Sequence, residues 1–196
     1  MTKKRNVGIF IFDGAEVLDF AGPFEVFAVA SEVHDHGLFD VFTVGEQLKP
    51  VSAVNGFSVN PTYDFNTCPR IDILVIPGGF GTRQQIENTS VLKWIKKNHQ
   101  NSELTLSVCS GSTLLGALGI LDGQAYCTHH EVYERMQNIV PTGMPQKDKR
   151  FVGFGKVFTS AGISAGIDLS FHVVETLHGK DIADQTAKYM EYEKLN

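Results

Sequence analysis

The strongest constraint on the fold is a set of short, mostly apolar runs, each followed by a turn or a helix-like segment. Val7–Phe12, Phe39–Val44, Ile71–Ile76 and Leu104–Val108 are such runs, and apolar character on both faces of a strand is typical of a buried parallel sheet. Helical periodicity occupies residues 17–33, 89–100, 110–118, 128–139, 163–177 and 182–193. This alternation predicts an α/β fold with a mostly parallel sheet covered on both faces, and a length of 196 residues favours one domain over 1–196.

Two hairpins are predicted from turn residues. Asn55-Gly56 interrupts an alternating segment at Val51–Val59, and Gly155 interrupts Phe151–Phe158. Both residue types favour the tight turns that connect antiparallel strands. Pro141–Arg150 is the most loop-like stretch of the chain.

Helix starts are predicted from proline and capping residues. Proline is comfortable only in the first turn of a helix, so the regular part of helix 17–33 is expected to begin at Pro23. Thr128 and Glu131 have the spacing of a capping box, which predicts reciprocal hydrogen bonds at the start of helix 128–139.

Charge, hydropathy and cysteine content exclude several classes of protein. The formal net charge of -5 disfavours nucleic acid as a partner, and no apolar run approaches the roughly 20 residues of a membrane span. Three scattered cysteines without a metal-binding spacing fit free thiols in a reducing compartment. We therefore expect a cytoplasmic protein that does not bind membranes.

The segment Ser107–Gly111 carries the candidate nucleophile. It places Cys109 between a buried strand and a helix, an arrangement similar to a nucleophile elbow in which Cys replaces Ser. Such a turn exposes the nucleophile at the carboxyl edge of the sheet, and a following helix start is expected to lower the pKa of the thiol. The bland alternative, a buried cysteine that acts as a small hydrophobic residue, fits the strand-turn-helix context less well.

Two other segments supply candidate partners. Pro77-Gly78-Gly79 ends the strand before the elbow strand, so the amides of Gly79 and Ser110 are expected to converge as an oxyanion hole. Asp19 follows the first strand among apolar neighbours, where it either caps a helix or faces a cleft. Arg83, close to the glycine turn, either faces the pocket or, as we favour, is solvated or structural.

Five ordered segments resemble the DJ-1/PfpI superfamily over nearly the whole chain, most of all its isonitrile hydratase branch. They are FDGAEVLDFAGPFEVF, ILVIPGGFGTR, LSVCSGSTLLGALGIL, CTHHE and FTSAGISAGIDLSFHVVETLHG. The resemblance implies a flavodoxin-like three-layer sandwich, a homodimer, Cys109 as nucleophile and Asp19 as the acidic residue beside it.

The resemblance also orders the functional alternatives. Ser110 stands where protease-like relatives carry His and isonitrile hydratases carry Thr, which disfavours peptide cleavage. Gly78, His129 and Gly162 are candidate pocket residues, although the segment around His129 departs from the usual TTHW.

The leading hypothesis is hydration of a small isonitrile to an N-substituted formamide through a covalent thioimidate on Cys109. A charged Asp19 would oppose the thiolate, so the pair is expected to share one proton and titrate as a unit. The alternatives are glyoxalase-like chemistry on an α-oxoaldehyde and a non-catalytic cysteine sensor. The resemblance extends to the sensor halves of AraC-type regulators, and we expect no room for their DNA-binding module after the last predicted helix. His130 and Glu134 lack a third ligand, so neither a metal nor a cofactor is expected.

Overall fold

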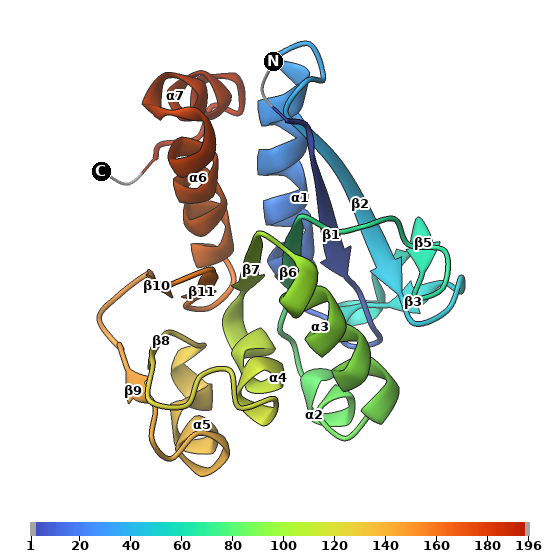
Figure 1. The fold of residues 1–196 in the computed structure, drawn as a ribbon, viewed down its shortest axis with the longest axis vertical. Coiled ribbons are helices and arrows are strands. Elements are labelled where there is room, and N and C mark those ends of the chain that lie inside the picture. Colours follow the sequence, from blue (N-terminus) through green and yellow to red (C-terminus); the bar gives the residue numbers. More distant parts are fainter. Residues whose placement is uncertain (1–2, 195–196) are drawn as a thin grey trace.

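A seven-stranded sheet forms the centre of the protein in the computed structural model, which describes residues 3–194 (Figure 1). The strand order is β10-β11-β7-β6-β1-β2-β5, and only the β10–β11 pair is antiparallel. The bounds are β1 Arg5–Phe10, β2 Phe39–Gly45, β5 Tyr63–Asp64, β6 Ile73–Ile76, β7 Leu104–Ser107, β10 Phe151–Phe154 and β11 Val157–Ser160. The predicted parallel strands are confirmed, whereas the edge strand β5 is too short to have been visible as a sequence pattern.

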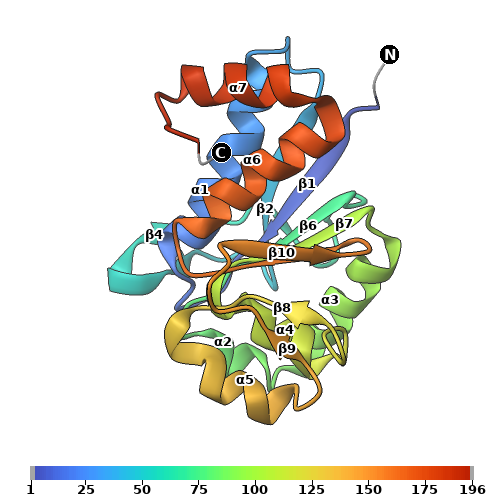
Figure 2. The ribbon, with the colours of Figure 1, turned by 90° about the vertical axis from the view of Figure 1, so that its left-hand side faces the viewer.

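Helices cover both faces of the sheet. On one face α1 (Val17–Glu32) packs against α6 (Ala165–His178) and α7 (Lys180–Tyr189). Figure 2 shows α3 (Thr89–Asn101) on the opposite side, where Trp94 packs its ring 5.7 Å from that of Phe10. The predicted α/β three-layer sandwich is therefore confirmed.

Short elements gather at the carboxyl end of the strands. They are α2 (Thr82–Gln85), the 3-10 turn η2 (Cys109–Gly111), α4 (Ser112–Ala117), the 3-10 turn η3 (His130–Val132) and α5 (Tyr133–Ile139). A two-residue ladder joins β8 (Ala125–Tyr126) to β9 (Met144–Pro145), so the loop predicted at Pro141–Arg150 contains a strand. In a parallel sheet this edge is where ligands bind.

Both predicted hairpins are present. The first consists of β3 (Val51–Ser52) and β4 (Ser58–Val59), joined by a turn in which Asn55 and Gly56 have positive φ. The second is the β10–β11 pair, with Gly155 at a φ of 53°.

The predicted start of the first helix at Pro23 is wrong, because α1 begins at Val17 and contains Pro23 in its interior. Proline removes one helical hydrogen bond, a cost of about 3 kcal/mol. Packing offsets that cost. Phe20 is buried, and Ile167 of α6 lies so close to Gly22 that a Cβ on Gly22 would be 2.8 Å from Ile167 Cγ1. Tertiary contacts thus extend the helix beyond its local preference.

The predicted capping box at Thr128 and Glu131 is also wrong. The Thr128 hydroxyl donates to the carbonyl of Cys109 at 3.0 Å, and the Glu131 amide is instead bound by His129 Nδ1 at 3.3 Å. Regular helix begins only at Tyr133. The buried carbonyl of Cys109 needs a hydrogen-bond donor, and it binds the Thr128 hydroxyl that the sequence pattern assigned to the helix start.

The last helix is shorter than predicted. It ends at Tyr189, because Glu191 has a φ of 50° and turns the chain back. Tyr192 then stacks on Phe171 and donates its hydroxyl to Asp168 at 2.8 Å.

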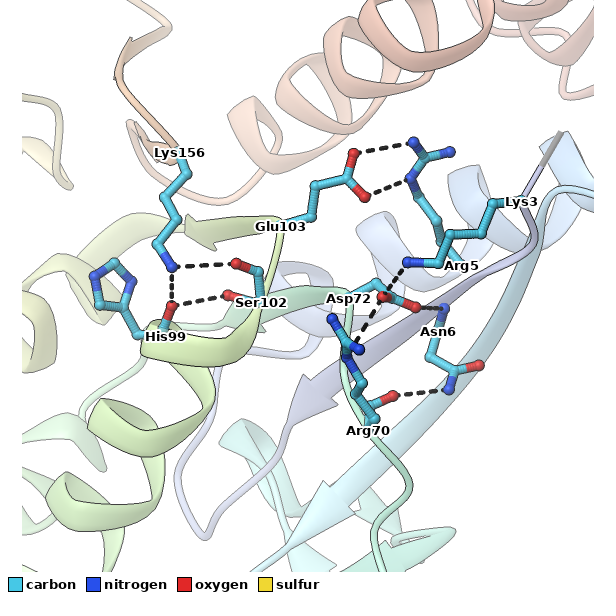
Figure 3. A network of polar contacts seen from close by, with 9 residues as sticks. All are labelled: Lys3, Arg5, Asn6, Arg70, Asp72, His99, Ser102, Glu103 and Lys156. Carbon is cyan, nitrogen blue, oxygen red and sulfur yellow. Dashed lines mark hydrogen bonds and ion pairs between the residues drawn. The ribbon is translucent and has the colours of Figure 1, made fainter.

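A polar network closes the amino-terminal edge of the sheet, away from the short elements (Figure 3). Asp72 accepts hydrogen bonds from Lys3 and the backbone of Asn6. Lys156 Nζ donates to three carbonyls at the end of α3, those of His99, Gln100 and Ser102. These contacts fix the strand ends at the edge opposite the elbow.

Candidate active site

Cys109 lies at a strained turn between β7 and α4. Its φ is +55°, a left-handed conformation that a non-glycine residue rarely adopts, and its side chain is 6% exposed. Three hydrogen bonds hold its backbone: its amide donates to the carbonyl of Ala161 at 3.1 Å, and its carbonyl accepts from Ser112 and Thr128. The nucleophile elbow predicted from the sequence is therefore present, and these hydrogen bonds hold Cys109 in its strained backbone conformation.

Gly111 permits the tight return of the chain. A Cβ at this position would lie 2.2 Å from the carbonyl oxygen of Ile76, a backbone atom of the neighbouring strand. Only glycine fits there, which explains the glycine two residues after the nucleophile.

Asp19 is fully buried in the first turn of α1. Its Oδ2 accepts a hydrogen bond from the Gly78 amide at 2.9 Å, and within residues 3–194 its Oδ1 has no hydrogen-bond partner. Burial raises the pKa of Asp19 to about 7, and Glu16 adds to the rise, while the Gly78 amide and the adjacent Cys109 oppose it. The structure thus places the predicted carboxylate beside the thiol.

The thiol of Cys109 is held in its protonated form. Burial raises its pKa to about 12, and the charge of Asp19 contributes, although the Ser110 and Ile163 amides favour the thiolate. The predicted lowering of this pKa by a helix start is therefore wrong, because η2 is a single 3-10 turn and desolvation of the sulphur dominates. The predicted opposition between a charged Asp19 and the thiolate is confirmed.

Ser110 and the glycine turn interlock. The Gly79 amide donates to Ser110 Oγ at 3.0 Å, and that hydroxyl donates back to the Gly79 carbonyl at 3.2 Å. A Cβ on Gly78 would lie 2.5 Å from the Ser110 amide nitrogen. The Ser110 amide faces the sulphur, whereas the Gly79 amide is engaged by the hydroxyl, so the two-amide oxyanion hole stays a prediction.

A cleft of about 260 Å³ opens above Cys109. His129 is part of its wall, and Gly162 lies behind that ring, where a Cβ would come within 2.3 Å of His129 Cδ2. Gly78, predicted as a pocket residue, is not part of the lining; its amide donates to Asp19, and it packs against Ser110. The lining residues are Glu16, Gly79, Phe80, Thr82, Arg83, Cys109, Ser110, His129, Glu131, Val132, Arg135 and Ile163.

Sequence reasoning missed Ile163 and Arg135 of the cleft, and it placed Arg83 there only as the less favoured alternative. Ile163 has a φ of 52°, unusual for a β-branched residue, and its amide lies near both Asp19 and Cys109. Arg83, expected to be solvated, is exposed but also lines the cleft, together with Arg135 of α5. Periodicity carries no signal for any of them, because only the folded chain brings these segments together.

Two further properties concern the described part of the chain. Among residues 3–194, no group of three or more His, Cys, Asp and Glu side chains is arranged to hold a metal ion. None of the helices within the same range is long and apolar enough to cross a membrane.

A mostly parallel sheet covered by helices, with a cysteine at a strained turn beside a buried carboxylate, is typical of an α/β protein with a nucleophile elbow. The chain belongs to the DJ-1/PfpI family, whose profile matches residues 5–176. Isonitrile hydratase of Pseudomonas putida is 34% identical over 189 residues, which cover 95% of this chain and 78% of the relative.

Other relatives differ in length and in name. The transcriptional regulator CdhR of Pseudomonas aeruginosa is 27% identical over 94% of this chain, and the matching region is 54% of the regulator. This chain thus spans about half the length of that regulator. A THiJ/PfpI family protein from Pseudomonas syringae has the same fold, with a TM-score of 0.88 and 26% identity over 100% of this chain and 78% of that one.

Proposed function

We propose that the protein hydrates a small isonitrile to an N-substituted formamide, with Cys109 as nucleophile and Asp19 as proton carrier. The observation that carries the proposal is the pairing of a thiol that lines the cleft with a fully buried carboxyl group beside it, whose pKa is about 7. Near neutral pH the thiol keeps its proton while Asp19 is close to half ionised, so the carboxyl group can accept a proton and give it back. The similarity to an isonitrile hydratase supports the substrate class.

The first step is addition of the thiol across the terminal carbon of the isonitrile. Asp19 takes the proton from Cys109 as the sulphur–carbon bond forms, and it delivers that proton to the same carbon. The product is a thioimidate, R–N=CH–S–Cys109. No net charge is created in the buried site, which suits a thiol whose pKa is about 12.

The second step is hydrolysis of the thioimidate. Water adds to the carbon, its oxygen forms the new bond, and one of its protons passes through Asp19 to the nitrogen. The carbon–sulphur bond then breaks, the sulphur regains a proton, and R–NH–CHO leaves. The Ser110 amide, which faces the sulphur, is positioned to stabilise negative charge that develops on it.

The two alternatives are supported less well. Oxidant sensing requires an exposed thiolate, whereas Cys109 is 6% exposed with a raised pKa. Glyoxalase-like chemistry has a relative in its favour, a Caenorhabditis elegans protein named as a glutathione-independent glyoxalase, 26% identical over 162 residues. Methylglyoxal is therefore the comparison substrate in the test below.

We also propose that the protein works as a cytoplasmic homodimer. Free thiols at Cys68, Cys109 and Cys127 suit a reducing compartment. Phe80 beside the cleft is 67% exposed, and Leu18 on α1 is 37% exposed, so a second copy would bury apolar surface near the site. Light scattering coupled to size exclusion measures the assembly, and a monomer at micromolar concentration contradicts this proposal.

The test of the activity is formamide production from a small isonitrile. Wild-type protein is expected to turn over, and Cys109→Ala is expected to be inactive, whereas Cys68→Ala, a change at a thiol outside the cleft, retains activity. Mass spectrometry of the quenched reaction is expected to find the thioimidate on the peptide that contains Cys109. Full activity of Cys109→Ala, or turnover of methylglyoxal alone, refutes the proposal.

A further inference from the structure

Two arginines line the cleft of Cys109. Arg83 comes from α2 and Arg135 from α5, and both line the wall of the cleft. The helix α4, which follows the nucleophile, packs against both α2 and α5 and so sets their positions (Figure 1). Among residues 3–194, neither guanidinium has a carboxylate oxygen within 4.0 Å.

The two guanidinium groups act on each other. Partial burial lowers the pKa of Arg135, and the charge of Arg83 lowers it further, while Glu87 opposes the change. Like charges at one cleft destabilise each other, and the cost falls when an anion binds between them. Guanidinium groups are the side chains best suited to bind a carboxylate, because they donate two parallel hydrogen bonds.

Among residues 3–194, the acidic residues of the cleft form no ion pair with either arginine. Glu16 lines the cleft and lies close enough to Asp19 for its charge to raise the pKa of that carboxyl group. Glu131 lies 3.9 Å from the ring of His130. The cleft therefore holds two arginines that form no ion pair among residues 3–194, while one of its carboxylates, Glu16, acts on the buried Asp19.

We infer that Arg83 and Arg135 form an anion subsite, and that the substrate of this protein is an isonitrile with a carboxylate or a similar anionic group. The subsite holds the anionic group away from the buried Asp19 while the isonitrile carbon reaches Cys109. The identification of the substrate as an isonitrile rests on the proposed function, whereas binding of an anion beside Cys109 does not.

Selective alkylation of Cys109 tests the subsite without any turnover. Two pairs of reagents differ in charge and length: iodoacetate with iodoacetamide, and 3-maleimidopropionate with its amide. The rate ratio of the anionic to the neutral reagent at Cys109, measured by peptide mass spectrometry, is expected to fall about 10-fold in Arg83→Gln or Arg135→Gln for at least one pair. The rates of the neutral reagents stay unchanged, which shows that the variants are folded.

Arg70→Gln is the matched control. It removes the same charge from an exposed arginine that does not line this cleft, and the ratio is expected to equal that of the wild type. Equal ratios in the wild type and both cleft variants, for both reagent pairs, overturn the anion subsite.

Kinetics then separate the two proposals. A carboxylate-bearing isonitrile is expected to have a kcat/KM about 10-fold or more above that of its neutral amide, with the preference lost in Arg135→Gln. Turnover of both isonitriles at equal kcat/KM refutes the anionic substrate and leaves the hydratase standing. Absence of any isonitrile turnover, with the alkylation preference present, refutes the hydratase and leaves the anion subsite standing.

Discussion

Replacement of Asp19 by Asn is expected to change how the stability of the protein depends on pH. The pKa of Asp19 rises from 3.8 in the unfolded chain to about 7 in the folded protein, mainly because the side chain is buried. Between these values the native state binds more protons than the unfolded state, so the free energy of unfolding falls as the pH rises. The loss begins near pH 3.8 and is complete above about pH 7.

The size of this effect follows from the same two values. Each pH unit of separation corresponds to 1.36 kcal/mol, so ionised Asp19 costs the folded protein about 4 kcal/mol above neutral pH. Asn keeps the oxygen that accepts from the Gly78 amide but does not titrate. The free energy of unfolding of Asp19→Asn, relative to wild type, is therefore expected to be about 4 kcal/mol higher at pH 8 than at pH 4.

Urea unfolding followed by the fluorescence of Trp94, the single buried tryptophan, measures this difference across pH 4–8. Other carboxylates titrate in both proteins and cancel in the comparison, and Cys109 does not ionise in this range. If the free energy of unfolding changes equally with pH in the two proteins, the argument is refuted, because Asp19 would then ionise at its ordinary pKa. The same variant is expected to lose isonitrile turnover, since it cannot carry a proton.

Three further substitutions test other parts of the structure. Gly78→Ala places a Cβ 2.5 Å from the Ser110 amide and is expected to cost about 1–3 kcal/mol and to reduce turnover, as unfolding and activity assays will measure; a stable, fully active variant contradicts the packing. Thr128→Val removes a hydrogen bond to the Cys109 carbonyl, so it is expected to lower both stability, by about 1 kcal/mol, and the rate of Cys109 alkylation. Lys156→Met removes donors from the end of α3 and is expected to cost roughly 1–2 kcal/mol with unchanged activity; altered kinetics would show that the two edges of the sheet communicate.

Local sequence patterns predicted the strands well because burial on both faces leaves a direct trace in composition. They failed where distant contacts overrode local preference. Pro23 lies inside α1 because packing against α6 offsets the lost hydrogen bond, and Thr128 binds the Cys109 carbonyl rather than a helix start.

The features of the candidate site were also predicted most directly where they depend on local sequence. Cys109 and Ser110 were predicted because strand, turn and helix are adjacent in sequence, so the chain itself encodes their proximity. Gly79 follows another strand, β6, and lies beside Ser110 only because β6 pairs with β7. Asp19 was predicted from its resemblance to a known motif, but its raised pKa comes from burial that only the fold provides.

The sequence by itself determined a parallel α/β sheet and a cysteine at a strand-to-helix turn, because strand apolarity and glycine placement are local properties. The tertiary structure alone decided that the thiol is protonated, that Ile163 directs an amide toward it, and that two arginines face its cleft. Desolvation and the spacing of charges depend on segments far apart in the chain, so no local pattern records them.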